Sequence, residues 1–212
     1  MGGSGPKLDR RAVVGGAAAT AAAVAAGGAA QAQARRTRYA IVGLGSRSAM
    51  FQQAITGPYK AHAELVAVCD LNPGRAALAQ QRARAMGAAE PRAFLHTDFD
   101  RMIRETKPAV MIVTTVDATH DDYIVRALDA GCHVITEKPM TITPEKAQRI
   151  LDACRRNNRS IQVTFNYRYS PPRTQVKDIL MSGEIGDVLS VDFHWLLNTN
   201  HGADYFPPLA QP

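Results

Sequence analysis

Short apolar runs alternate with segments of helical periodicity through the middle of the chain. The run at residues 109–115, AVMIVTT, is β-branched and bounded by polar or turn residues, as expected for the centre of a sheet that is buried on both faces. Because parallel strands need helical crossovers, the alternation predicts an α/β fold with a doubly wound parallel sheet of the Rossmann type. The expected strands lie at residues 39–42, 64–69, 92–95, 109–115, 132–136 and 161–165.

Capping residues set the expected helices between these runs. A first helix is expected over residues 49–55, and a longer one begins after Asn72, with proline at its first position. Asp98, Thr119 and Thr143 have side chains that can accept hydrogen bonds from the first turn of a helix. We therefore expect each of them to cap a further helix.

The pattern changes after Arg168. One more helix is expected over residues 171–182, with Val176, Ile179 and Leu180 facing inward. Residues 189–195 then alternate strictly between apolar and polar, which is typical of a strand with one buried face in an antiparallel sheet.

A single half-buried strand is not stable alone, so a second domain is expected to begin here and to be incomplete in this chain. The predicted organisation is a dinucleotide-binding domain at residues 35–167 and the truncated start of an α+β, antiparallel-sheet domain at residues 168–212.

The N-terminal segment has the features of an export signal. Arg10 and Arg11 precede an uncharged Ala/Gly-rich run that ends at Ala34, and Ala32-Gln33-Ala34 resembles a cleavage site. A transmembrane helix is the alternative, but the run lacks Leu, Ile and Phe. We predict that residues 1–34 are a signal peptide for the twin-arginine export machinery, which implies a periplasmic or extracytoplasmic protein without a stable membrane span.

Composition excludes several functional classes. The chain has 212 residues, 46% hydrophobic and 21% charged, which is globular composition. Its net charge of +6 comes from basic residues dispersed along the chain, so a nucleic-acid partner is not expected. Three cysteines without C-x-x-C spacing predict buried thiols and no metal site.

The turn at residues 43–48, GLGSRS, follows the first predicted strand. Gly43 and Gly45 occupy the first two glycine positions of a dinucleotide-binding turn, where backbone amides approach a pyrophosphate closely. The third glycine of that pattern is replaced by Ser48, so an ordinary strand-to-helix turn is the alternative.

Asp70 lies at the end of the second predicted strand. Its distance in sequence from the glycine turn is close to that at which a carboxylate of a dinucleotide-binding domain contacts the adenosine ribose. A carboxylate there repels a 2′-phosphate, which favours NAD over NADP, although Arg47 and Arg75 could each meet a phosphate. The alternative is that Asp70 caps residues 71–73. Gly43, Asp70, Thr115 and Lys138 all lie at the carboxyl ends of predicted strands, where ligands of open parallel sheets bind.

Taken together, several motifs resemble those of the glucose-fructose oxidoreductase/inositol dehydrogenase/MocA (Gfo/Idh/MocA) family. The matching stretches are GLGSRS at 43–48, CD at 69–70, TTVDATH at 114–120, EKP at 137–139 and NYRY at 166–169. The resemblance implies an NAD- or NADP-binding Rossmann domain and a C-terminal domain that shapes the substrate pocket and makes homo-oligomer contacts. It also implies hydride transfer between nicotinamide and a hydroxyl-bearing carbon of a sugar, polyol or related small molecule.

The resemblance also assigns roles to residues. Lys138 matches the family lysine beside the nicotinamide and the substrate oxygen, where an ammonium stabilises or relays the proton that leaves the hydroxyl. Glu137 would position Lys138, and His120 would hold the cofactor loop rather than transfer protons. A surface lysine fixed by Pro139 is the alternative for Lys138. Val116 replaces a proline that is usual in the family. The implied cofactor-binding residues are Gly43, Leu44, Gly45, Ser46, Arg47, Asp70, Thr114, Thr115, His120, Glu137, Lys138, Asn166 and Arg168.

Asn166 and Arg168 could instead make hydrogen bonds at the domain junction. The family's acid/base histidine has no match here, because His194 and His201 lack its context, and we expect a frameshifted or incomplete reading frame from residue 207. Two alternative functions follow: a nucleotide-binding fragment without turnover, and a Rossmann-fold binder of another nucleotide such as a methyl donor.

Overall fold

The computed structural model describes residues 36–196 and divides into two compact units between Thr164 and Phe165. The predicted signal peptide, His201 and the segment from residue 207 lie outside the described residues. Each unit is described by itself. None of the described helices is long and apolar enough to span a bilayer.

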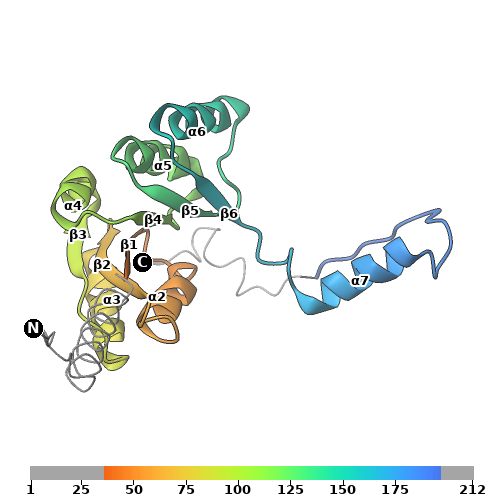
Figure 1. The fold of residues 1–212 in the computed structure, drawn as a ribbon, viewed down its shortest axis with the longest axis horizontal. Coiled ribbons are helices and arrows are strands. Elements are labelled where there is room, and N and C mark those ends of the chain that lie inside the picture. Colours follow the sequence, from red (N-terminus) through yellow and green to blue (C-terminus); the bar gives the residue numbers. More distant parts are fainter. Residues whose placement is uncertain (1–35, 197–212) are drawn as a thin grey trace, which may run out of the picture. The chain divides into compact units, whose positions relative to one another are not determined.

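The first unit is built on a six-stranded sheet in which every neighbouring pair is parallel (Figure 1). The strand order is β3-β2-β1-β4-β5-β6, so the chain moves outward from β1 on one side and then returns to continue on the other. This order is that of a doubly wound Rossmann sheet, as the sequence predicts. The strands are β1 (Thr37–Val42), β2 (Ala63–Asp70), β3 (Arg92–Leu95), β4 (Val110–Val113), β5 (His133–Glu137) and β6 (Ile161–Thr164).

Helices cover both faces of this sheet, and alternate strand residues pack under different helices. Ile41 belongs to a core cluster with residues of α2 and α3, whereas its neighbour Val42 belongs to a cluster with residues of α4, α5 and α6. Burial on both faces explains why the central strands are apolar at every position. The helices are α2 (Ser48–Thr56), α3 (Pro73–Ala85), α4 (Phe99–Thr106), α5 (His120–Asp129) and α6 (Pro144–Asn157), with 3-10 turns η1 (His96–Asp98) and η2 (Asp117–Thr119).

Two of the four predicted caps are present. The side chain of Asn72 accepts a hydrogen bond from the amide of Gly74, and that of Thr143 accepts one from the first turn of α6. The predicted caps at Asp98 and Thr119 are wrong, because neither side chain accepts a hydrogen bond from a backbone amide in the first turn of its helix. A 3-10 turn precedes each of these two helices and directs the side chain elsewhere: Thr119 donates to the carbonyl of Val116.

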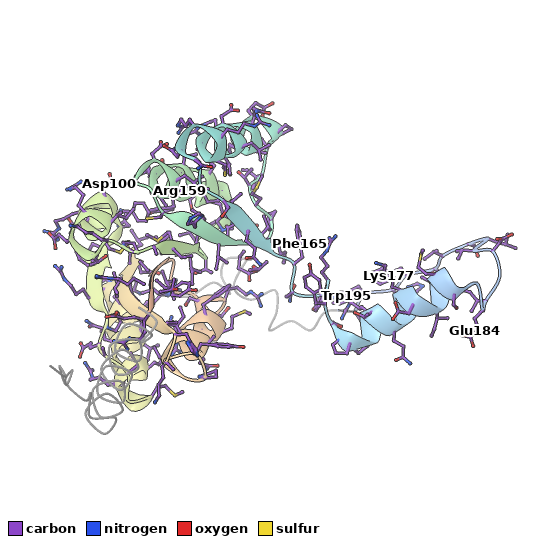
Figure 2. The ribbon with its side chains drawn as sticks, in the orientation of Figure 1. Asp100, Arg159, Phe165, Lys177, Glu184 and Trp195 are labelled. Carbon is purple, nitrogen blue, oxygen red and sulfur yellow. The ribbon has the colours of Figure 1, made fainter. Side chains whose placement is uncertain are left out.

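The second unit contains α7 (Pro171–Ser182), which ends at Gly183 with a left-handed backbone. Val176, Ile179 and Leu180 are exposed, so the expected inward face is wrong within the part of this unit that the structure describes. All residues of α7 are exposed, Lys177 among them (Figure 2).

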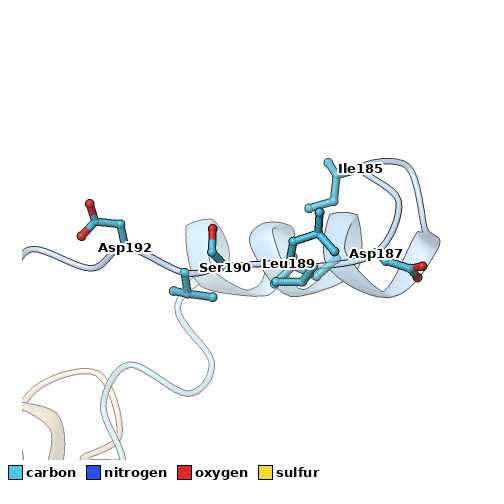
Figure 3. A pocket seen from close by; sticks show the side chains of 8 residues that line it. Ile185, Asp187, Leu189, Ser190 and Asp192 are labelled. Atoms are coloured by element: carbon cyan, nitrogen blue, oxygen red, sulfur yellow. The ribbon is translucent and has the colours of Figure 1, made fainter.

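The predicted strand at residues 189–195 is likewise absent from the described part of the second unit, where this segment is extended and exposed. No neighbouring strand is present between residues 165 and 196 to complete its hydrogen bonds. The segment runs beside α7 and encloses a shallow hollow of about 530 Å³ with it, lined by Leu180, Ile185 and Leu189 among others (Figure 3). That hollow contains none of the predicted site residues.

Candidate functional site

The turn between β1 and α2 needs glycine at its first position. Gly43 has a φ of +84°, and a Cβ atom built there would lie 2.5 Å from the amide nitrogen of Thr115. The hydroxyl of Thr114 also donates to the carbonyl of Gly43, at 2.5 Å. The backbones after β1 and β4 therefore touch, which brings the GLGSRS turn and the TTVDATH stretch together at the carboxyl edge of the sheet.

Ser48 shows why the third glycine of the usual pattern can be replaced. Its side chain is fully buried, and its hydroxyl donates to the carbonyl of Gly45 at 2.7 Å. The same hydroxyl accepts a hydrogen bond from the side-chain amide of Gln52 at 2.9 Å. Ser48 thus joins the turn to the first turns of α2 through hydrogen bonds.

Gly45 has a different environment. A Cβ atom placed there would meet no atom within 4 Å, so the described part of the protein gives no packing reason for glycine. The amides of Gly45, Ser46 and Arg47 donate to no group within residues 36–196. Three free amides at the N-terminus of a helix are the features that bind phosphate, and the turn therefore fits a pyrophosphate.

Asp70 lies beside this turn at the end of β2 and is 6% exposed. Its carboxylate accepts a hydrogen bond from the amide of Leu44 at 2.5 Å and another from the amide of Asn72 at 2.8 Å. The second bond is the local cap that we considered as the alternative role. The first one fixes the glycine turn, so Asp70 has a structural role at the place where a ribose would be bound.

Glu137, at the end of β5, is the centre of a second group of contacts. Its side chain is buried, and the same carboxylate oxygen accepts from Arg47 and from the hydroxyl of Thr164, each at 2.9 Å. Arg47 follows β1, and Thr164 ends β6, so this carboxylate joins three strand ends. Arg47 is therefore paired with an acid.

Lys138 directly follows Glu137 and is exposed. Its ammonium makes no hydrogen bond or ion pair within the described range 36–196. The ammonium is thus available to a ligand at the edge where the glycine turn and Asp70 lie.

His120 joins the two loops that flank this edge. It is fully buried at the start of α5, with Nδ1 2.9 Å from the carbonyl oxygen of Pro139 and Nε2 3.0 Å from that of Thr115. These contacts agree with the expectation that His120 holds the loop after β4. Val116, in the same loop, is exposed.

The loop after β4 is also supported from α6, by contacts that the sequence reading missed. Asp121 is buried and accepts from Lys146 at 2.7 Å and from Arg149 at 2.8 Å. Lys146 also donates to the carbonyl of Ala118 at 2.6 Å. Thr164 was missed as well, although the rule that ligands gather at strand ends would have selected it.

Two predicted residues are not placed at this edge. Asn166 and Arg168 belong to the second unit, which begins at Phe165. Their predicted contacts with the cofactor remain predictions.

Two of the three thiols, those of Cys69 and Cys132, are buried as predicted, whereas Cys154 is partly exposed. Burial raises the pKa of Cys69 to about 12 and that of Cys132 to about 11. Among the described residues, no group of histidine, cysteine and carboxylate side chains is arranged to hold a metal ion.

Comparisons with known proteins agree with this geometry. Residues 37–165 match the family model described as "Oxidoreductase family, NAD-binding Rossmann fold" (GFO_IDH_MocA). YteT of Bacillus subtilis (strain 168) is 39% identical over 165 residues, which are 77% of this chain and 38% of that protein. Inositol 2-dehydrogenase of Salmonella paratyphi B is 36% identical over 129 residues, covering 60% and 37% of the two chains.

A solved structure is similar as well. Scyllo-inositol dehydrogenase from Lactobacillus casei, determined with NAD(H) and scyllo-inositol, superposes with a TM-score of 0.62 at 25% identity. The match covers 72% of this chain and 43% of that one. The chain thus spans about two fifths of the length of these relatives.

Proposed function

Because the chain belongs to the Gfo/Idh/MocA family of oxidoreductases, which has an NAD-binding Rossmann fold, we propose that it binds a nicotinamide dinucleotide at the carboxyl edge of its sheet. The turn after β1 is the observation that carries this proposal. Among residues 36–196, it offers three amides without partners beside a glycine that has no packing reason to be glycine. Asp70 at the neighbouring strand end supports NAD over NADP, because a carboxylate repels a 2′-phosphate.

The protein's reaction is hydride transfer between the nicotinamide and a hydroxyl-bearing carbon of a sugar, polyol or related compound. The inositol dehydrogenases among its relatives support this substrate class. When bound, the nicotinamide ring accepts or supplies the hydride. Lys138 has an exposed ammonium that can donate a hydrogen bond to the substrate oxygen and relay its proton. Glu137, held by Arg47 and Thr164, fixes the strand end from which Lys138 extends.

Nucleotide binding and turnover should be measured separately on the 212-residue chain. NADH fluorescence titration is expected to give saturable binding, with Lys60→Met binding NADH as the unmodified chain does. Oxidation of an inositol and sugar panel with NAD is expected to be lost in Lys138→Met and retained in Lys60→Met, a control at an exposed lysine distant in sequence.

The possible outcomes distinguish the competing functions. Absence of NADH binding would refute the proposal and leave a binder of another nucleotide. Binding of NADH without oxidation of any panel member would identify a nucleotide-binding fragment that lacks turnover.

We also propose that the protein is exported by the twin-arginine route and that its full-length form is a homo-oligomer. The Arg10-Arg11 pair before an uncharged Ala/Gly-rich run supports export. A reporter fused after residue 34 should reach the periplasm, and changing both arginines to lysine should retain it in the cytoplasm. Export that is unchanged by the double substitution would contradict this route.

A further inference from the structure

His120 has an arrangement of hydrogen-bond partners that a neutral histidine cannot satisfy. Its ring is fully buried, and both ring nitrogens lie within 3.0 Å of backbone carbonyl oxygens, those of Pro139 and Thr115. A carbonyl oxygen only accepts hydrogen bonds. A neutral imidazole has one N–H group, whereas the protonated ring has two.

We propose that His120 is a positioning residue that donates from both ring nitrogens at once and thereby joins the loop after β4 to the segment that carries Lys138. The inference rests on the proposed role of Lys138. Each bond would be assisted by the positive charge of the ring, which makes it stronger than a bond between neutral groups. The bond to Pro139 lies one residue after Lys138 in the chain.

The nearby carboxylates do not compete with the two carbonyl oxygens for the ring N–H groups of His120. Asp121, next in α5, is bonded to Lys146 and Arg149 of α6. Glu137 of β5 is bonded to Arg47. Further charged residues of these segments are Asp117 in η2 and the exposed Lys138. In α5, Asp122 pairs with Arg126 of the same helix, and Asp129 pairs with Arg156 of α6. No carboxylate forms an ion pair with His120 within the described residues.

The bond to Pro139 completes a support for Lys138 on both sides. The preceding residue, Glu137, is held through its carboxylate by Arg47 and Thr164. The following residue, Pro139, is held through its carbonyl by His120. The backbone of Lys138 is thus fixed while its ammonium stays free for a ligand, which is the preorganisation that a reacting group needs.

The proton count of the ring can be measured directly. The 212-residue chain, labelled with ¹⁵N, contains six histidines, and His120→Asn identifies the signals of His120 by their loss. At about neutral pH, ring spectra are expected to show directly attached protons on both nitrogens of His120. A proton on only one nitrogen would overturn the proposal, since one of the two bonds would then be absent.

A matched pair of variants tests the effect on Lys138. The side-chain amide of His120→Asn replaces Nδ1 and can donate towards Pro139, whereas that of His120→Gln replaces Nε2 and can donate towards Thr115. We expect His120→Gln to change the acetylation rate of Lys138, relative to Lys60 in the same molecule, by about fivefold. His120→Asn should change it by less than about twofold.

Equal effects in the two variants, or none in either, would refute the link from His120 to Lys138. Neither readout requires turnover or NADH. Failure of the chain to bind NADH would therefore refute the proposed function and leave the result for His120 unaffected.

Discussion

Alanine substitution at the two glycines of the β1–α2 turn should affect different properties: Gly43→Ala should lower stability, whereas Gly45→Ala should weaken NADH binding and leave stability unchanged. At Gly43 a Cβ atom would lie 2.5 Å from the backbone nitrogen of Thr115 and 2.6 Å from the carbonyl of Thr114, atoms that cannot rotate away. The positive φ of Gly43 adds a backbone penalty of about 1–2 kcal/mol for any side chain. Overpacking typically costs about 1–3 kcal/mol. Gly43→Ala should therefore lower the free energy of unfolding by about 2–5 kcal/mol.

Gly45→Ala is the matched control for stability. The added methyl group meets no atom within 4 Å, and Gly45 does not have a positive φ. Its free energy of unfolding should stay within about 0.5 kcal/mol of the unmodified value or rise slightly, because alanine restricts the unfolded chain. NADH affinity should nevertheless fall about tenfold or more, since the methyl group occupies the space that a pyrophosphate needs.

Urea unfolding followed by far-UV circular dichroism measures the first quantity, and NADH fluorescence titration measures the second. The tryptophan signal is unsuitable for unfolding, because Trp195, the only tryptophan, lies in the second unit. Equal losses of stability in the two variants would refute the packing argument. Unchanged NADH affinity in Gly45→Ala would refute the assignment of this turn to the pyrophosphate.

Three further outcomes follow from buried polar groups. Cys69 and Cys132 should not react with thiol reagents near pH 8 until the chain unfolds, because their pKa values are raised from 9.0 to about 12 and about 11. The thiols of the unfolded chain lose their protons at lower pH than those of the folded chain. The free energy of unfolding, measured with urea, should therefore fall as the pH rises above about 9. Asp70→Asn should cost about 1–3 kcal/mol in the same assay, because a carboxamide has one acceptor oxygen for two backbone amides. Asp121→Ala should cost about 1–3 kcal/mol, which is less than for a fully buried pair because Lys146 remains partly exposed.

The architecture of the first unit could be predicted because its signals are local. Central strands such as β4 are continuous apolar runs, and Asn72-Pro73 marks the start of α3 by its capping chemistry. The convergence of Gly43, Asp70 and Lys138 followed from the rule that parallel strands end at one edge. The links from Gly43 to Thr115, from Leu44 to Asp70 and from Arg47 to Glu137 agree with that expectation.

The contacts within the site could not be predicted, because they depend on how distant segments meet. Arg47 and Glu137 are 90 residues apart in the chain, and no local pattern indicates that they pair. The sequence reading left Arg47 available for a phosphate for this reason.

The sequence-based predictions were wrong where tertiary structure overrides a local sequence pattern. Asp98 and Thr119 have the chemistry of caps, yet a 3-10 turn removes the geometry. The alternation at residues 189–195 is typical of a strand, but a strand forms only beside a partner, and residues 165–196 supply none.

The hydroxyl of Ser48 has a consequence for the speed of ligand capture. By bonding to the carbonyl of Gly45, which also accepts from the amide of Ser48, it adds to the resistance against a flip of this peptide plane. The receptor for the phosphates is therefore already assembled before the nucleotide arrives, and little ordering remains to be done during the encounter. Stopped-flow traces with NADH should accordingly show one phase whose rate rises linearly with concentration, and Ser48→Ala should introduce a slower step that levels off.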